Sequence, residues 1–122
     1  MKFTILCYPK CDTCRKAVKW LEESRIEYKY RDIKQENPSG DELAAWHEKS
    51  GLPLRKFFNT SGLLYKSMAL KDKLPEMGKT EMLELLASDG MLVKRPILLG
   101  EGFVLLGFRE AEWEERLRHE RA

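Results

Sequence analysis

A Cys-x-x-Cys pair, Cys11 and Cys14, stands between a predicted strand and a predicted helix, and this placement constrains the fold most. Residues 2–8 alternate in the manner of a strand. Residues 12–24 carry apolar side chains at the i, i+3, i+4 and i+7 spacing of a helix with one apolar face. A second short strand over residues 28–33 completes a βαβ unit, so we expect its two strands to be parallel.

The last part of the chain returns to strand patterns. Residues 96–99 and 103–108 are apolar, and the glycine-containing segment 100–102 separates them, which predicts an antiparallel hairpin. A charged helix is predicted over residues 110–121. The order βαβ followed by ββα is typical of an α/β, thioredoxin-like fold with a mixed four-stranded sheet, and we expect a single domain over residues 1–122.

Between these two parts, a helical insertion is predicted over about residues 39–90. A Ser-x-x-Glu capping box at residues 39–42 indicates a helix over residues 40–49. A further helix is predicted over residues 79–89, with Gly90 as its C′ residue. The plain thioredoxin-like fold has one helix where this insertion stands.

Composition and charge exclude several classes of function. With 22 basic and 20 acidic residues, the net charge of +2 is too even to indicate direct nucleic-acid binding or an acidic membrane surface. No apolar run is long enough to span a bilayer, and the first residues lack the features of a signal peptide. The three cysteines cluster, unlike the dispersed even set of a disulfide-stapled secreted domain. We therefore expect a cytoplasmic protein without membrane contact.

The position of the Cys-x-x-Cys pair predicts redox chemistry with unequal roles for its thiols. Cys11 precedes the helix, where free N–H groups and the helix dipole lower a thiol pKa, and we expect it to be exposed and nucleophilic. Cys14 shares the apolar helix face and is expected to be the resolving thiol that closes the disulfide. Cys7 lies on the inward strand face, where a small buried hydrophobic residue is the favoured interpretation.

Two other interpretations of the cysteines are weaker. Ordinary packing would not explain why the pair falls at a strand-to-helix junction. Structural zinc needs four ligands, usually as two pairs, and beyond the Cys-x-x-Cys only Cys7, His47 and His119 remain, with nothing to pair them. We expect no metal site.

Arg95 and Pro96 begin the predicted hairpin and form the second candidate feature of the site. In thioredoxin-like folds this position carries a cis-proline whose loop lies against the thiol pair. Arg95 would then reach the Cys11 sulfur, lower its pKa and hold an anion or a mixed disulfide. A solvated arginine before an ordinary strand-initial proline explains these residues equally well when they are taken alone.

Five segments resemble the arsenate reductase (ArsC)/Spx family in both order and spacing. They are Pro-Lys-Cys-Asp-Thr-Cys-Arg-Lys-Ala at residues 9–17, Trp-Leu-Glu-Glu at 20–23, Asn-Thr-Ser-Gly at 59–62, Lys-Arg-Pro-Ile-Leu at 94–98 and Leu-Gly-Phe at 106–108. The resemblance covers nearly the whole chain. It implies a thioredoxin-like fold with a helical insertion.

Carried over to this chain, the resemblance implies that Cys11 is the nucleophile and Arg95 an anion-binding residue. Glutaredoxin-linked arsenate reductases have a serine at the position of Cys14. They also carry two further arginines around the oxyanion, which align with Asn59 and with a position near Gly107. A single remaining arginine would hold a multiply charged oxyanion such as arsenate weakly.

The expected function is therefore a thiol–disulfide oxidoreductase resembling arsenate reductase. Cys11 would attack an oxidised substrate, Cys14 would resolve the adduct, and glutathione/glutaredoxin or thioredoxin would act as external reductant, with no bound cofactor. An inactive relative that keeps only the fold is a further alternative.

A regulator is the alternative from a different class, because the Cys-x-x-Cys variant also resembles Spx. Spx is a redox-sensing transcriptional regulator that binds RNA polymerase, and here the switch would be a Cys11–Cys14 disulfide. Gly51 falls roughly where Spx carries a partner-contacting glycine, although a helix-terminating glycine explains it at least as well.

Overall fold

The computed structural model describes residues 3–121, with the side chains described as far as residue 118. The predicted strand start at Lys2 and the side chain of His119 lie outside this part. The described helices include none with the length and apolarity needed to cross a membrane.

The chain divides into two compact units. One consists of residues 1–31 and 95–122, and the other of residues 32–94. The predicted helical insertion, at about residues 39–90, falls within the second unit.

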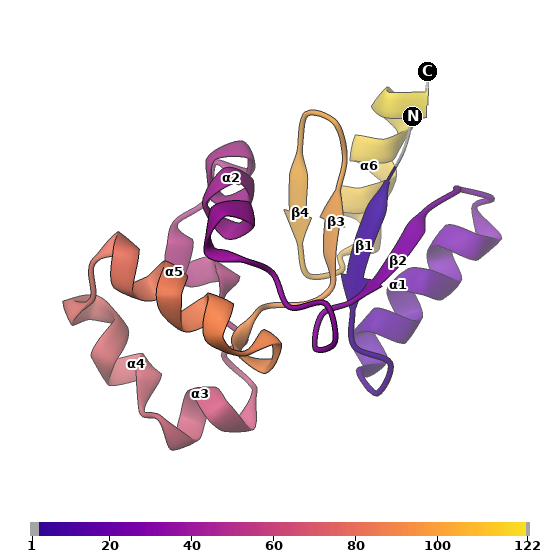
Figure 1. Ribbon diagram of the computed structural model, residues 1–122. Coiled ribbons are helices and arrows are strands. Elements are labelled where there is room, and N and C mark those ends of the chain that lie inside the picture. The colour runs from indigo at the N-terminus through magenta and orange to yellow at the C-terminus, as the bar shows by residue number, and fades with distance from the viewer. Residues whose placement is uncertain (1–2, 122) are drawn as a thin grey trace. The chain divides into compact units, whose positions relative to one another are not determined.

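A four-stranded sheet organises the first unit (Figure 1). Its order is β2-β1-β3-β4, with β1 pairing antiparallel to β3 and β3 antiparallel to β4. The sheet is mixed, and β1 and β2 form its parallel pair, as the βαβ pattern predicted. The strands are β1 (Thr4–Cys7), β2 (Lys29–Asp32), β3 (Ile97–Leu99) and β4 (Val104–Leu106).

Each strand is shorter than the sequence pattern predicted, for local reasons. The turn closed by the Cys11 N–H and the Tyr8 carbonyl, 3.0 Å apart, ends β1 at Cys7. β3 begins only after Pro96, which has no N–H to donate to the ladder. β4 stops before Gly107, whose φ of 73° is outside the strand region.

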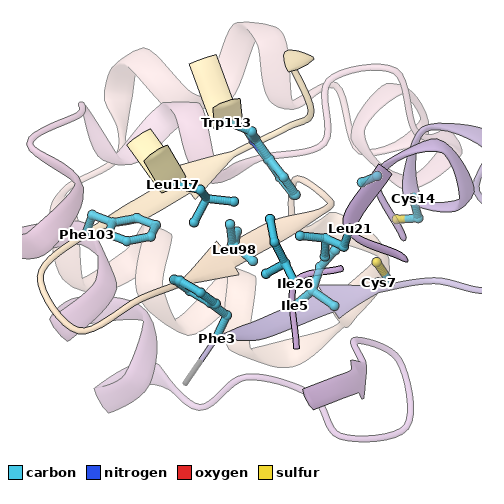
Figure 2. Packing of buried hydrophobic residues seen from close by; sticks show 11 residues of the cluster. Phe3, Ile5, Cys7, Cys14, Leu21, Ile26, Leu98, Phe103, Trp113 and Leu117 are labelled. Carbon is cyan, nitrogen blue, oxygen red and sulfur yellow. The ribbon is translucent and has the colours of Figure 1, made fainter. Parts of the chain in front are cut away.

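The core of the first unit lies between the sheet and two helices, α1 (Asp12–Glu23) and α6 (Glu110–Arg121). Alternate residues of β1 face it, because strand side chains alternate in direction. The two apolar residues of α6 that face this core, Trp113 and Leu117, are buried. Figure 2 shows the cluster, which consists of Phe3, Ile5, Cys7, Cys14, Ala17, Leu21, Ile26, Leu98, Phe103, Trp113 and Leu117.

The second unit is helical, as predicted for the insertion. It contains α2 (Gly40–Ser50), η1 (Leu54–Phe57), α3 (Leu63–Ser67), α4 (Leu70–Lys73), η2 (Leu74–Glu76), α5 (Lys79–Ser88) and η3 (Gly90–Leu92), where η denotes a 3-10 helix. Its core is built from Leu43, Trp46, Leu54, Phe57, Phe58, Leu70, Leu74, Leu86, Leu92 and Val93.

The termini of α2 confirm the sequence signals. The Ser39 hydroxyl accepts from the Glu42 N–H at 3.1 Å, and the Glu42 carboxylate accepts from the Ser39 N–H at 3.0 Å, which completes the capping box. Gly51 ends the helix with a φ of 69°. A helix-terminating role therefore accounts for this glycine.

Gly90 lies at the C′ position of α5, as predicted, directly after the C-cap Asp89. It does not take the left-handed conformation common at that position but opens η3. A Cβ on Gly90 would overlap the Ile33 carbonyl oxygen and lie 2.8 Å from Oδ1 of Asn37. Glycine is needed here because another backbone segment approaches closely.

Candidate thiol site

The junction of β1 and α1 gathers all three cysteines in the free, reduced form. Cys7 is the last residue of β1, Cys11 is the N-cap of α1, and Cys14 lies in its first turn. The strand-to-helix position predicted for the Cys-x-x-Cys is therefore confirmed. As an N-cap residue, Cys11 has extended rather than helical backbone angles. Its carbonyl nevertheless accepts the first hydrogen bond of the helix, from the Arg15 N–H at 3.0 Å.

Burial separates the three thiols. Cys7 is 0% exposed and Cys14 is 2% exposed, as their inward positions predicted. Cys11 is only half-buried, packed against the edge of the core, whereas the sequence suggested an exposed residue. The turn that begins at Tyr8 folds Cys11 back towards the sheet. Of the three cysteines, Cys11 is therefore the one that is not fully buried.

The surroundings favour a thiolate on Cys14. A hydrogen bond from the Cys7 thiol lowers the pKa of Cys14 most, and burial of Cys14 opposes this effect. Hydrogen bonds from the Tyr8 N–H and the Cys11 thiol lower the Cys14 pKa further, as does the positive charge of Arg95. Together they lower the pKa of Cys14 from 9.0 to about 6. The helical pattern contains no signature of hydrogen bonds between elements, so sequence reasoning could not predict this lowering of the Cys14 pKa.

The Cys7 thiol behaves in the opposite way. Its hydrogen bond to Cys14 and its burial raise the pKa of Cys7 far above the ordinary range, and the neighbouring thiols Cys14 and Cys11 act in the same direction. Cys7 therefore stays protonated and acts as the donor towards the Cys14 sulfur. The sequence interpretation of Cys7 as a packing residue accounts for its burial but missed this hydrogen bond. The only available signal was the close spacing of the three cysteines.

The Arg95–Pro96 peptide bond is cis, as predicted for this position. Pro96 is buried and Arg95 half-buried. The guanidinium carbon of Arg95 lies 5.4 Å from the centre of the Tyr8 ring, a cation–π distance. Arg95 thus lies over the residue that follows β1, and its positive charge acts on the Cys14 sulfur.

Arg15 holds the loop that carries Cys11 from the solvent side. Its Nε donates to the Pro9 carbonyl at 3.0 Å, and its guanidinium pairs with the Asp12 carboxylate at 3.1 Å. Asp12 also lies in the first turn of α1, where the helix dipole favours an acidic side chain. These exposed contacts neutralise Asp12 beside the thiols.

An aromatic cluster connects α1, α6 and the end of β4. The Trp113 ring packs edge-on against Phe108 at 4.9 Å and against Trp20 of α1 at 6.2 Å. Trp113 Nε1 donates to the Gly107 carbonyl at 3.1 Å, and the Gly107 N–H donates to the Pro96 carbonyl at 2.8 Å. The cis-proline loop is thereby tied to the helix that carries both site cysteines.

Asn59 belongs to the second unit, where it is buried in a tight turn. Its N–H donates to the Leu92 carbonyl at 2.8 Å, and its side-chain oxygen accepts from the Ser61 hydroxyl at 3.2 Å. A Cβ on Gly62 would lie 2.6 Å from the Asn59 amide nitrogen. The Asn-Thr-Ser-Gly segment therefore has a structural explanation within its own unit. Among residues 3–118, no group of three or more His, Cys, Asp or Glu side chains is arranged to hold a metal ion.

The mixed four-stranded sheet, with a Cys-x-x-Cys at its first strand-to-helix junction, places this protein in the class of thioredoxin-like α/β proteins. The chain belongs to the ArsC family, whose sequence profile matches residues 6–116.

Two solved structures are similar over nearly the whole chain. An ArsC family related protein from Bacteroides fragilis is 54% identical, with a TM-score of 0.91 over 94% of this chain and 97% of that one. A "possible arsenate reductase" from Streptococcus mutans UA159 is 45% identical, with a TM-score of 0.85 over 93% of this chain and 97% of that one.

Two relatives compared by sequence carry different descriptions. The uncharacterized protein YusI of Bacillus subtilis is 54% identical over 94% of this chain and 98% of its own length. The global transcriptional regulator Spx of Enterococcus faecalis is 30% identical over 89% of this chain and 81% of its own length. The family thus includes proteins described as enzymes and proteins described as regulators.

Proposed function

We propose that this protein is a thiol–disulfide oxidoreductase of the ArsC family that works through a Cys11–Cys14 couple. The observation that carries the proposal is the contrast between the two thiols at the start of α1. Cys11 is accessible, whereas Cys14 is 2% exposed and is held as a thiolate by hydrogen bonds. Disulfide exchange needs an accessible sulfur that attacks as a thiolate, and the buried Cys14 thiolate can accept the proton of the accessible Cys11 thiol.

In the proposed reaction, the Cys11 sulfur attacks one sulfur of a substrate disulfide. Its proton passes along the hydrogen bond to the Cys14 sulfur, and the second substrate sulfur leaves as a thiolate that takes a proton from solvent. Cys14 then returns its proton to solvent and attacks Cys11. This step forms the Cys11–Cys14 disulfide and releases the first substrate sulfur as a thiol.

Two equivalents of an external thiol, such as glutathione or the thiols of glutaredoxin or thioredoxin, reduce the disulfide again. They are oxidised to one disulfide, so electrons balance over the cycle. Arg95 lies over Tyr8, and its positive charge stabilises the negative charge on the Cys14 sulfur during the cycle.

A small or peptide disulfide suits this site better than arsenate. The positions that align with the family's further arginines are Asn59, which is buried in a turn, and the neighbourhood of Gly107, which takes a left-handed conformation. Neither Asn59 nor Gly107 itself supplies a positive charge. Arg95 alone offers little to a multiply charged oxyanion.

The test uses two single substitutions and a disulfide substrate in glutathione buffer. Cys14→Ser, mixed with the substrate before glutathione is added, should trap a Cys11 mixed disulfide that mass spectrometry detects, because the resolving thiol is gone. Cys11→Ser should abolish turnover without trapping substrate. Cys7→Ser is the matched control, and it should still form the Cys11–Cys14 disulfide. Equal residual turnover in the Cys11 and Cys14 variants would contradict the assigned roles.

A redox-sensing regulator is the second candidate, favoured by the similarity to Spx over most of the chain. In this case the Cys11–Cys14 disulfide would alter binding to a protein partner such as RNA polymerase, and no substrate would be turned over. A pull-down with purified RNA polymerase, using reduced and oxidised protein, tests this alternative. Binding that is absent or indifferent to the oxidation state would count against it.

A further inference from the structure

Cys7 is the one thiol of the cluster that the proposed reaction does not use. It occupies the last core-facing position of β1 and is 0% exposed. Valine or isoleucine would fill such a strand position at least as well, because a cysteine is a small hydrophobic residue in a core. Unlike them, cysteine brings an S–H donor.

The fold places Cys7 beside Cys14 in one buried cluster. Tyr8 directly follows Cys7, and its N–H donates to Cys14 Sγ at 3.4 Å, so the end of β1 supplies a backbone donor to this sulfur. The Cys7 thiol adds a side-chain hydrogen bond to the same atom. Figure 2 shows the Cys7 and Cys14 side chains at the same end of the core, one from the strand and one from the helix.

We propose that Cys7 is a positioning residue of the redox site, which stabilises the Cys14 thiolate of the reduced protein and thereby makes the Cys11–Cys14 disulfide easier to reduce. The redox part of this inference rests on the proposed function.

The Cys7 hydrogen bond differs in strength between the reduced and the oxidised protein. In the reduced protein, the Cys7 S–H donates to an ionised sulfur, and a hydrogen bond to a charged acceptor is about twice as strong as one between neutral groups. In the disulfide, the Cys14 sulfur is neutral and bonded to Cys11, so the Cys7 hydrogen bond weakens. An interaction that favours the reduced form makes the couple a stronger oxidant.

The other groups that act on these sulfur atoms stay constant when Cys7 is changed. They are the Tyr8 N–H, the Cys11 thiol and the positive charge of Arg95 for Cys14. Substitution of Cys7 therefore isolates one donor within an otherwise intact set.

The first experiment titrates the Cys14 thiolate by its ultraviolet absorbance in a Cys11→Ser background. Adding Cys7→Ala or the better-filling Cys7→Val should raise the Cys14 pKa, because both remove the S–H donor. Cys7→Ser keeps a hydroxyl donor and should restore part of the low pKa. A Cys14 titration midpoint that is unchanged in both Cys7→Ala and Cys7→Val would overturn the inference.

The second experiment equilibrates the full-length protein, with Cys11 and Cys14 intact, in glutathione buffers. Cys7→Val should lower the ratio of reduced to oxidised protein at a fixed buffer composition by about tenfold or more, the scale of one hydrogen bond to a charged group. An unchanged ratio would overturn the redox part of the inference. Failure of the unsubstituted protein to form the Cys11–Cys14 disulfide would instead refute the proposed function, while the thiolate titration would still decide the role of Cys7.

Two variants guard against a purely structural effect. Cys7→Val fills the core position of Cys7, so cooperative unfolding of this variant establishes an intact core. A general loss of structure would abolish the thiolate signal in Cys7→Ser as well as in Cys7→Val. Partial recovery in Cys7→Ser alone therefore identifies the donor as the cause.

Discussion

The backbone N–H of Tyr8 donates to the sulfur of Cys14 across 3.4 Å. This contact joins the end of β1 to the first turn of α1, where helix N–H groups and the helix dipole also favour negative charge. The site is thus assembled from a strand end, a helix start and the adjacent cysteine, Cys7. The predictions below test what this assembly does to the thiols and what holds it together.

The low pKa of Cys14 predicts a pH-dependent stability of the reduced protein. Folding lowers the pKa of this thiol from 9.0 to about 6, which adds stability to the folded state. This stability is fully present when the pH is above the pKa of the unfolded chain, 9.0, and is lost as the pH falls through the pKa of the folded protein, about 6. The free energy of unfolding should therefore rise by on the order of 2 kcal/mol from pH 6 towards pH 9, relative to Cys14→Ser. Denaturant unfolding with reductant present measures it, and parallel pH profiles for the two proteins would contradict it.

Arg95 should affect the same titration, but less than Cys7 does. Its charge is the smallest of the influences that lower the pKa of Cys14, and the Cys7 hydrogen bond is the largest. In the Cys11→Ser background, Arg95→Met should raise the Cys14 pKa, while Arg95→Lys should retain most of the effect because it keeps the charge. Absorbance titration ranks the variants. A larger shift for Arg95→Met than for Cys7→Val would reverse the assignment of causes.

Trp113 should stabilise the first unit through its indole N–H as well as its bulk. Trp113→Phe leaves the Gly107 carbonyl without this donor and leaves space in the core, so a loss of roughly 1–3 kcal/mol is expected. Trp20→Phe is the matched control and should cost less, because the Trp20 side chain is half-buried. Chemical denaturation compares the two, and an equal or larger loss for Trp20→Phe would disagree with this account.

Gly90 and Gly40 should respond to alanine in opposite ways. Gly90→Ala would drive a methyl group into the Ile33 carbonyl and should cost roughly 1–3 kcal/mol. Gly40 is the first residue of α2 and has open space around its Cα, so Gly40→Ala should be neutral or stabilising by up to about 1 kcal/mol. Thermal unfolding of both variants tests the contrast, which similar midpoints would refute.

Much of the local structure was predictable because it depends on neighbours in the chain. Hydrophobic period located the strands and the helices α1, α5 and α6, and the Ser-x-x-Glu signal located the start of α2. The left-handed Gly51 follows the same principle, since it reflects what glycine allows its own backbone. The cis bond before Pro96 was instead expected from its position in a thioredoxin-like fold. Errors in this local part were confined to strand ends, where turns and Pro96 interrupted the ladder.

The features that the sequence alone could not supply involve contacts between distant segments. From the sequence, Gly90 was interpreted only as a residue that ends a helix. The close approach of the Ile33 carbonyl, which requires a glycine there, could not be predicted because Ile33 is far away in the chain. The half-buried position of Cys11 depends on how the Tyr8 turn packs against the core.

The sequence by itself determined that two thiols stand at a strand-to-helix junction, since spacing and period fix that placement. Only the tertiary structure decided that the pKa of Cys14 is lowered to about 6, with the hydrogen bond from Cys7 as the largest cause. The physical reason is that a thiol pKa responds to donors and charges within a few ångströms. The packing of β1 against α1 brings those groups together.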